Sequence, residues 1–445
     1  MFERPRSNSQ AILVSLDFLH GEDNPLEEFE LLARSAGAEP SAVISGRRAE
    51  PEPRYLIGKG KAEEVRDAAR RTGAGLVLVN HELTPSQERN LERLCEVRVL
   101  DRSGLILDIF AQRAQTFEGK LQVELAQLEH LSTRLVRGWS HLERQKGGIG
   151  LRGPGETQLE TDRRLIGVRM KHIRARLEKV RRQREQGRRR RRRAAQPTIS
   201  LVGYTNAGKS TLFNRLTGAG TYAADQLFAT LDPTHRMVEL PGAGRVVLVD
   251  TVGFIRNLPH ELVAAFRATL EESRLADLLI HVTDAHEPER QEQVAQVEAV
   301  LEEIGADGVP LLEVCNKIDL LEEGGPRVEY DSGGEPVRVW ISARTGAGLD
   351  LLREAVASRL HRGLGAFRLE LPPAAGRLRA RLHELQAVQS EESLADGGWR
   401  LELLIEPARL DSLIREAGLE PDEVIGGGWE GPVSRAVAGG GGNTF

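Results

Sequence analysis

The chain has 445 residues, more than one hydrophobic core normally organises, so its length predicts two to four domains. Apolar residues make up 40% of the chain, but no apolar run approaches the ~20 residues of a membrane-spanning helix, which argues against a membrane span. The two cysteines, Cys95 and Cys315, stand far apart, which argues against a disulfide framework and against a zinc site. The start of the chain is polar and lacks the long apolar core of a secretory signal, and the cysteines are few, so we expect a reduced, cytoplasmic protein.

The net charge of −5 conceals a strongly basic segment. Residues 163–193 hold 16 Lys and Arg against 2 Asp and Glu, a local charge of +14, which leaves −19 for the rest of the chain. One basic segment in an acidic protein indicates a polyanionic partner, and nucleic acid fits best. Aromatic residues are only 4% of the chain, so phosphate contacts are favoured over base stacking. The alternative is a solvated helix face joined to a linker.

The first domain, residues 1–117, alternates apolar runs with helical patterns. Asn24-Pro25 and Thr84-Pro85 open two of the helices with residue types that are preferred at the N-cap and at the first helical position. Strand–helix alternation with short links predicts a parallel sheet covered by helices. The predicted strands are 11–18, 42–45, 76–79 and 97–100, and the predicted helices are 24–35, 61–71, 84–94 and 105–112.

Residues 118–187 change to a pattern of long helices. Leucines from Leu121 to Leu142 recur at steps of mostly three and four, which predicts a helix over 118–146. Five glycines and a proline within 147–155 must break that helix. A second helical pattern follows over 156–186, so we expect an antiparallel hairpin with arms ~40 Å long and a glycine-rich loop at its tip.

Composition marks the remaining boundaries. Residues 188–197 begin with six arginines and end in Ala-Ala-Gln-Pro, which predicts a flexible basic linker. A strand–helix domain is expected over 198–365, a small α/β domain over 366–430, and a glycine-rich, disordered tail over 431–445. The predicted fold class is therefore multidomain α/β with one long helical hairpin.

A glycine-bounded loop, Gly203 to Ser210, follows a predicted strand over 199–202. The loop matches G-x-x-x-x-G-K-[ST] and a helix follows it, which is the context that this phosphate-binding motif requires. Its backbone N–H groups form a nest for phosphate oxygens, and the helix N-terminus adds a positive dipole. Lys209 is expected to reach the β- and γ-phosphates of the nucleotide, and the Ser210 hydroxyl to bind Mg²⁺.

Two further segments complete the predicted contacts to Mg²⁺ and the γ-phosphate. A strand over 246–249 ends at Asp250, which suits a water-mediated contact to Mg²⁺. The Gly253 N–H, three residues on, would contact the γ-phosphate. Thr230, between this strand and the P-loop, is the predicted second Mg²⁺ ligand, with Thr234 as the competitor.

Guanine selectivity is predicted from Asn316-Lys317-Ile318-Asp319, which follows an apolar strand over 311–315. The Asp319 carboxylate can accept hydrogen bonds from guanine N1–H and the 2-amino group, and adenine lacks both donors. Asn316 can bond the other edge of the purine, Lys317 can lie over the ring, and Ser342-Ala343 fits a backbone contact to guanine O6. Four such elements in this order predict a central, Ras-like P-loop GTPase domain.

The predicted catalytic residues are Lys209, Thr230 and Gly253. The predicted metal ligands are Ser210, Thr230 and, through water, Asp250. The predicted nucleotide-binding residues are Gly203, Tyr204, Thr205, Asn206, Ala207, Gly208, Lys209, Ser210, Thr211, Phe228, Ala229, Thr230, Leu231, Asp232, Asp250, Thr251, Val252, Gly253, Asn316, Lys317, Ile318, Asp319, Ser342, Ala343 and Arg344.

Phe254 stands where many GTPases place a glutamine that orients the attacking water. A phenyl ring cannot do so, which predicts slow hydrolysis by the isolated protein, with the water ordered by a partner, a cation or a rearranged switch. Asn206 resembles the asparagine of potassium-assisted GTPases, so K⁺ is a candidate cofactor beside Mg²⁺. The alternative is that Asn206 only shapes the loop.

These residues resemble the HflX family of ribosome-associated GTPases, within the Obg–HflX group. The resemblance lies in the P-loop with Leu212-Phe213-Asn214 after it, in 228–234 and 250–254, in 113–126 and in 147–164, and it covers roughly residues 10–365. It implies binding to the large ribosomal subunit and dissociation of stalled or idle ribosomes, often under stress. In this family the hairpin reaches into ribosomal RNA, which makes Arg152, Arg163 and Arg164 the predicted RNA-binding residues. A monomer is expected.

Two other functions remain open at this point. Gly58-Lys59-Gly60-Lys61 could present N–H groups and lysines to a second phosphate, although an ordinary strand–helix turn explains it as well. A second nucleotide site there would suit an NTP-driven RNA remodelling enzyme. A regulatory factor in assembly of the large subunit is the other alternative.

Overall fold

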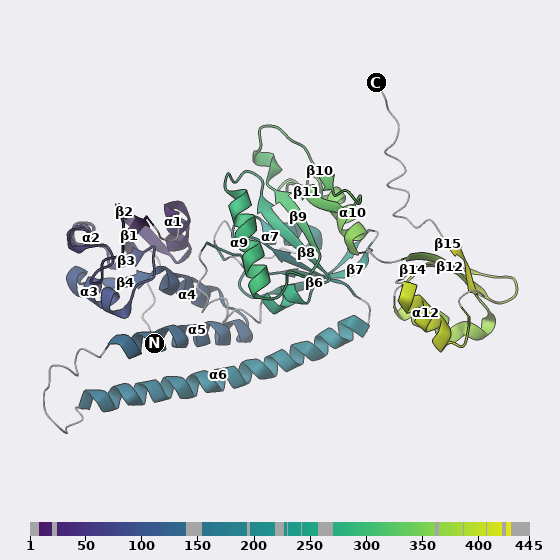
Figure 1. Ribbon diagram of the computed structural model, residues 1–445, viewed down its shortest axis with the longest axis horizontal. Helices are drawn as coiled ribbons and strands as arrows, with labels where there is room; N and C mark the ends of the chain where they lie inside the picture. Colours follow the sequence, from purple (N-terminus) through teal and green to yellow (C-terminus); the bar gives the residue numbers. More distant parts are fainter. Residues whose placement is uncertain are drawn as a thin grey trace.

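The computed structural model describes residues 9–19, 25–138, 154–193, 196–218, 227–228, 230–241, 243–256, 270–360, 365–385, 387–405, 407–420 and 424–428. An N-terminal domain, a central seven-stranded domain and a small C-terminal domain follow one another along the long axis of the molecule (Figure 1). Two long helices run beneath the first two of these units (Figure 1). Among the described helices, none combines the length and apolar character that a membrane crossing needs.

The N-terminal domain confirms the predicted parallel sheet, in the strand order β2-β1-β3-β4. Helix α3 begins with a capping box, in which Thr84 Oγ1 accepts from Gln87 N (3.3 Å) while Gln87 Oε1 accepts from Thr84 N (2.9 Å). The elements are β1 (Ser9–Phe18), α1 (Leu26–Ser35), β2 (Ala38–Arg48), α2 (Lys59–Thr72), β3 (Leu76–Val79), α3 (Pro85–Cys95), β4 (Arg98–Asp101) and α4 (Arg102–Arg113).

Helices α5 (Phe117–Gly138) and α6 (Pro154–Arg193) are the two arms of the predicted hairpin. They run antiparallel, because Arg184 pairs with Glu118 (2.7 Å) near one end and Arg174 pairs with Glu129 (2.8 Å) farther along. Leu121, Leu125 and Ile173 form a small apolar core between them. The glycine-rich tip and Arg152 lie outside the described residues.

Helix α6 is longer than predicted at both ends. It begins at Pro154, because proline suits the first helical position, where its missing N–H leaves no bond unmade. It then continues through Gly187 and the six arginines to Arg193, so the expected flexible linker is wrong for residues 188–193. Arginine has a high helix propensity, and one glycine costs an otherwise helical segment only about 1 kcal/mol.

The central domain is a seven-stranded sheet in the order β10-β11-β9-β8-β5-β7-β6, parallel except at its two edges. The carboxyl ends of its parallel strands therefore meet at one edge, where α/β sheets bind their ligands. The elements are β5 (Thr198–Val202), α7 (Lys209–Thr217), β6 (Thr234–Leu240), β7 (Gly244–Asp250), β8 (Leu278–Asp284), α9 (Arg290–Glu303), β9 (Leu311–Asn316), β10 (Arg327–Tyr330), β11 (Pro336–Trp340) and α10 (Leu349–Leu360).

The C-terminal domain has the β-α-β-β-α-β order of ferredoxin-like folds, with an antiparallel sheet ordered β13-β14-β12-β15. Two of its strands, β13 and β15, were not predicted, because β13 is polar and β15 is short and glycine-rich. The elements are β12 (Gly365–Leu371), α11 (Gly376–Glu384), β13 (Val388–Ser393), β14 (Trp399–Ile405), α12 (Pro407–Glu416) and β15 (Ile425–Gly428). The predicted multidomain α/β fold class is confirmed.

Candidate nucleotide-binding site

The P-loop joins β5 to α7 at the carboxyl edge of the central sheet, and two of its glycines are required by space. A Cβ at Gly203 (φ 139°) would lie 2.2 Å from the Val282 carbonyl oxygen. A Cβ at Gly208 (φ 95°) would lie 2.2 Å from Asn316 Nδ2. Both positions therefore need a residue without a side chain, as the motif predicts.

Lys209 occupies the centre of the loop. Its ammonium group is buried and donates to the carbonyl oxygens of Gly203 (3.0 Å) and Tyr204 (2.7 Å). Burial lowers the pKa of Lys209 to about 8, an effect that the nearby Asp250 carboxylate partly opposes. The site thus holds a desolvated cation, which gains by acquiring a phosphate oxygen as a partner.

Nucleotide binding at alkaline pH should be coupled to proton uptake at Lys209. In the free protein the amine is mostly neutral at pH 9, since its pKa is about 8. The phosphates of a bound nucleotide favour the charged form and raise that pKa, so binding of GDP at pH 9 should take up about one proton. Calorimetric titration in buffers of different ionisation enthalpy measures the uptake. Near pH 7 the Lys209 amine is already mostly charged, so the uptake should be small there, and a zero value at pH 9 would contradict the depressed pKa.

Three predicted metal ligands converge beside Lys209. Ser210 Oγ lies 2.8 Å from Asp250 Oδ2 and 2.9 Å from Thr230 Oγ1, and Thr230 Oγ1 also donates to Asp250 Oδ2 (2.8 Å). The second oxygen of Asp250, Oδ1, is buried without a hydrogen bond to any described residue. Two hydroxyls, one carboxylate and a buried oxygen without a partner are the hard donors that Mg²⁺ takes, so the residues fit the ion. Thr234 instead begins β6, where it pairs with Asp250 in the sheet.

The segment after β7 is bound to the P-loop through its backbone. Phe254 N donates to Gly203 O (3.1 Å), and Thr205 N donates to Phe254 O (2.7 Å). The Phe254 side chain is 2% exposed and packs in the apolar core, and a phenyl ring has no group that could orient a water. A Cβ at Gly253 would lie 2.9 Å from Lys209 Nζ. The Gly253 backbone is therefore close enough to Lys209 to contact the same phosphate group.

The residues predicted to recognise guanine form one connected loop system at the ends of β9 and β11. Asn316 Nδ2 donates to Ala207 O (2.8 Å) and Asn316 Oδ1 accepts from Ala343 N (2.8 Å), so this side chain ties the P-loop to 342–344. The Asp319 carboxylate accepts from Ser342 Oγ (2.5 Å) and pairs with Arg344 (2.5 Å). Lys317 pairs with Asp284 (2.7 Å).

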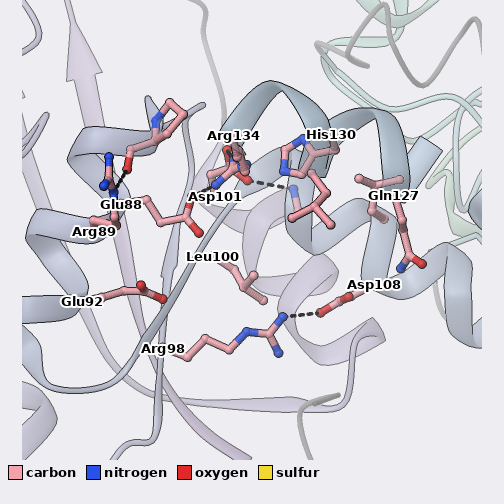
Figure 2. A pocket seen from close by; sticks show the side chains of 14 residues that line it. Glu88, Arg89, Glu92, Arg98, Leu100, Asp101, Asp108, Gln127, His130 and Arg134 are labelled. Atoms are coloured by element: carbon pink, nitrogen blue, oxygen red, sulfur yellow. Dashed lines mark hydrogen bonds and ion pairs between the residues drawn. The ribbon is translucent and has the colours of Figure 1, made fainter. Parts of the chain in front are cut away.

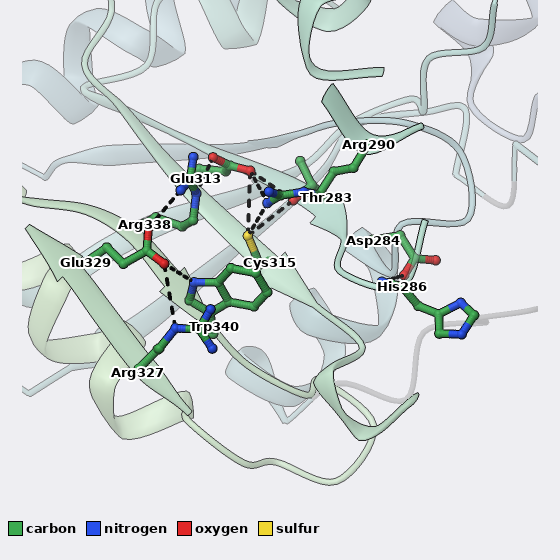
Figure 3. A network of polar contacts seen from close by, with 10 residues as sticks. All are labelled: Thr283, Asp284, His286, Arg290, Glu313, Cys315, Arg327, Glu329, Arg338 and Trp340. Atoms are coloured by element: carbon green, nitrogen blue, oxygen red, sulfur yellow. Dashed lines mark hydrogen bonds and ion pairs between the residues drawn. The ribbon is translucent and has the colours of Figure 1, made fainter. Parts of the chain in front are cut away.

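A polar network behind this loop was not predicted from the sequence (Figure 3). Glu313 on β9 pairs with Arg290 of α9 (3.0 Å) and Arg338 of β11 (2.6 Å). Glu329 on β10 bonds Arg338 (2.7 Å) and accepts from Trp340 Nε1 (2.7 Å). These contacts fix β9, β10 and β11 to one another, which sets where Asn316 and Ser342 stand. These ion pairs could not be predicted from residue spacing, because the paired residues lie on different helices and strands.

The N-terminal domain also contacts the site, which the sequence did not predict. The Tyr204 hydroxyl donates to Glu28 on α1, and Glu28 also pairs with Arg102 on α4, whose side chain is 3% exposed. Arg102 Nη2 donates to the Arg256 carbonyl (3.0 Å), two residues past Phe254. One buried ion pair of the N-terminal domain thus contacts the P-loop and the segment after β7.

Three of the other predicted nucleotide-binding residues, Phe228, Ala229 and Asp232, differ from the rest. Ala229 is outside the described residues. The side chains of Phe228 and Asp232 face the N-terminal domain: the Phe228 ring packs on Phe110 (centroids 4.6 Å apart), and the Asp232 carboxylate accepts from Gln115 N (2.8 Å). Thr211 is in α7, Leu231 is buried, Thr251 Oγ1 donates to Leu201 O (2.5 Å), Val252 is buried, and Ile318 is in the turn after Lys317.

Gly58 and its two lysines form the turn into α2. Gly58 has a φ of 79° and its Cβ would lie 2.5 Å from Arg48 Nη1, while Lys59 and Lys61 pair with Glu63 (3.9 Å) and Glu64 (2.9 Å) of the same helix. These contacts favour the strand–helix turn over a second phosphate site.

A cavity of about 420 Å³ lies elsewhere in this domain, between α3, β4, α4 and α5 (Figure 2). Four of its charged lining residues form two pairs: Arg134 with Asp101 (2.6 Å) and Arg98 with Asp108 (3.7 Å). The first of these pairs binds α5 to the end of β4. The cavity wall thus fastens the first arm of the hairpin to the N-terminal domain.

Family models match three consecutive parts of the chain. Residues 23–111 match "GTP-binding GTPase N-terminal", residues 113–191 match "GTP-binding GTPase Middle Region", and residues 198–317 match "50S ribosome-binding GTPase". The three matches follow the N-terminal domain, the hairpin and the first part of the central domain.

Curated relatives match over nearly the whole length. "GTPase HflX" of Escherichia coli (strain K12) is 58% identical over 426 residues, which cover 93% of this chain and all of that protein. "GTPase HflX" of Magnetococcus marinus is 46% identical over 402 residues, 90% of this chain and 92% of that protein. Among solved structures, a GTP-binding protein from Sulfolobus solfataricus in complex with GDP is 25% identical, covering 80% of this chain and 99% of that chain with a TM-score of 0.44.

Proposed function

The chain belongs to the HflX family of GTPases, and from this premise we propose that its GTP-bound form binds the large ribosomal subunit and dissociates stalled or idle ribosomes. The observation that carries the proposal is the joining of a guanine-nucleotide site to a 40-residue basic helix, α6. The match of residues 198–317 to a family described as ribosome-binding supports it. Such a protein would work in the cytoplasm, as a monomer.

The proposal assigns the nucleotide contacts to residues that lie close together in the candidate site. Lys209 would contact the β- and γ-phosphates, Ser210 and Thr230 would be direct ligands of Mg²⁺, and Asp250 would contact the ion through water. The ion would neutralise charge on the phosphates. Asp319, Asn316 and the backbone at 342–344 read guanine.

Slow hydrolysis by the isolated protein is part of the proposal. Phe254 is buried in the apolar core, so another group must orient the attacking water, and the ribosome is the proposed source of the stimulation. Asn206 is exposed on the P-loop with a φ of 61°, which is compatible with a K⁺ site at the phosphates. Hydrolysis rates measured in K⁺ and in Na⁺, with and without ribosomes, test both statements.

Sedimentation of ribosomes is the decisive experiment. Intact ribosomes are incubated with the protein and GTP, a non-hydrolysable GTP analogue, GDP or ATP, and are then separated on sucrose gradients. Free subunits should appear with GTP and with the analogue and stay few with GDP and with ATP. Equal subunit binding in GTP and GDP would refute the nucleotide control, because a ligand without differential affinity shifts no equilibrium. Activity with ATP would favour an RNA remodelling enzyme, and binding restricted to immature subunits would favour an assembly factor.

Arg163 and Arg164 should contact ribosomal RNA. Both are exposed near the start of α6, and no ion pair links them to another described residue, whereas Arg169 pairs with Glu124 (2.7 Å). Replacing both by glutamine should lower the slope of log K against log salt for binding to the large subunit by about 1 to 2, since each phosphate contact contributes about 0.7 to 0.9. The matched control replaces the exposed Arg377 and Arg409 of α11 and α12, which should leave the slope unchanged.

A further inference from the structure

The Asp232 carboxylate is bound to the start of the hairpin, although Asp232 is only two residues from Thr230. It accepts from Gln115 N (2.8 Å), Thr116 N (2.8 Å) and Thr116 Oγ1 (2.5 Å), immediately before α5 begins. Thr116 Oγ1 in turn accepts from Gly119 N (2.9 Å), as an N-cap residue does. One carboxylate of the central domain therefore completes the N-terminus of a helix in another domain.

Gly119 makes this approach possible. A Cβ at Gly119 would lie 2.0 Å from Asp232 Oδ1 and 3.1 Å from Thr116 Oγ1. Glycine is otherwise a poor residue in the first turn of a helix, where alanine would be more stable. Helix α5 therefore has a residue of low helix propensity, Gly119, in the turn that contacts Asp232.

The residues just before Thr230 contact the N-terminal domain. The Phe228 ring packs edge-on against Phe110 of α4, and Leu227 N donates to Ser35 Oγ of α1 (3.1 Å). Thr230 therefore lies between two contacts with the N-terminal domain, while its own hydroxyl bonds Ser210 and Asp250 in the nucleotide site.

These contacts cannot form independently of one another. Consecutive Cα atoms are about 3.8 Å apart, so two residues allow little slack between Thr230 and Asp232. Helix α5 is in turn fixed to the N-terminal domain by Arg134 and to α6 by Arg184 through Glu118. A shift of Thr230 away from the nucleotide site would pull Asp232 from α5, and a shift of α5 would disturb Thr230.

We propose that Asp232 is a positioning residue that couples the Mg²⁺- and γ-phosphate-binding Thr230 to the first arm of the hairpin. GTP holds Thr230 and thereby the Asp232–α5 contact, and loss of the γ-phosphate releases both. Because coupling between sites is reciprocal, a partner that holds the hairpin in this position raises the affinity for GTP. The inference rests on the GTPase activity within the proposed function and not on the ribosome.

The test uses the full chain without ribosomes. Affinities for GDP and for a non-hydrolysable GTP analogue, both with Mg²⁺, are measured for the wild type, Asp232→Asn, Gly119→Ala and the control Asp307→Asn. Asp307 is exposed in the loop before β9, at the sheet edge opposite the P-loop. Hydrogen exchange of the peptide spanning 113–121 is followed with each nucleotide.

Both variants should lower the affinity for the analogue more than the affinity for GDP, by about 5-fold or more in the ratio, which is the lower range of measured couplings. The 113–121 amides of the wild type should exchange more slowly with the analogue than with GDP, and this difference should disappear in both variants. The control should behave as the wild type.

Two outcomes would overturn the proposal. One is an unchanged affinity ratio together with an unchanged exchange difference. The other is an equal loss of both affinities, which would mean that Asp232 only stabilises the fold. Gly119→Ala tests the same contact from the α5 side, because its Cβ would displace the Asp232 carboxylate while alanine itself favours the helix, so a change in the affinity ratio cannot be attributed to a weakened α5. These measurements use no ribosomes, so a failure to dissociate ribosomes would not change their interpretation. Likewise, a negative result for Asp232 would not refute ribosome dissociation.

Discussion

Asp319→Asn should weaken GDP binding by about 10³-fold or more, since a buried site built to hydrogen-bond a substrate group loses that order of affinity when the pairing fails. The carboxylate is oriented by Ser342 and Arg344, and the proposed guanine contacts need acceptors at both oxygens. An asparagine presents an NH₂ group where guanine also presents a donor. Fluorescence titration with labelled GDP measures the loss.

Xanthosine diphosphate provides the matched control for this substitution. Xanthine carries a carbonyl oxygen in place of the 2-amino group, so the asparagine amide can donate to it. The variant should bind xanthosine diphosphate more tightly than the wild type does. Loss of both nucleotides would indicate a damaged loop, and unchanged GDP binding would show that Asp319 does not read the base.

Lys209→Met should lower kcat/KM for GTP hydrolysis by about 10²-fold or more, the magnitude that one well-placed charged donor contributes to transition-state stabilisation. Lys209 is the buried cation at the centre of the P-loop, and no flexible surface group can replace it. Release of phosphate at saturating and limiting GTP measures the effect, with Lys171→Met, an exposed position on α6, as the control.

The folded state should survive this substitution. The Lys209 ammonium is desolvated and bonds only backbone carbonyls of its own loop, so methionine removes a buried charge without creating an apolar void. The melting temperature of the nucleotide-free variant should equal or exceed that of the wild type. A large drop in melting temperature would mean that the loss of activity reports misfolding.

The fold was predictable where local sequence decides it. Leu76–Val79 is a short apolar run between helices and is a strand at those bounds, and Thr84-Pro85 marks the start of α3. The prediction failed for β13, whose sequence VQSEES is polar and becomes a strand only by pairing with β14. It failed again at 188–193, where charge suggested a linker but the arginines extend α6.

The nucleotide site was predictable for the same reason. Its motifs are contiguous, so Lys209, Asp250 and Asn316 could be assigned from spacing alone. The contacts from the N-terminal domain could not, because Glu28 and Gln115 are more than a hundred residues from Tyr204 and Asp232. Asp232 was assigned to the nucleotide by its motif, and the structure adds a partner for its side chain that no motif contains.

The length of α6 has a mechanical consequence. Near its end, Arg184 bonds Glu118 and lies 3.8 Å from Glu272 of the central domain, so the helix is braced there between two domains. The thirty residues from Arg184 back to Pro154 span ~45 Å and the nine onward to Arg193 span ~14 Å, at 1.5 Å per residue. Since α6 is also paired with α5 at Arg169 and Arg174, a force on the hairpin end would load both arms together and would reach the central domain at Arg184, nine residues before α6 ends and the chain enters β5.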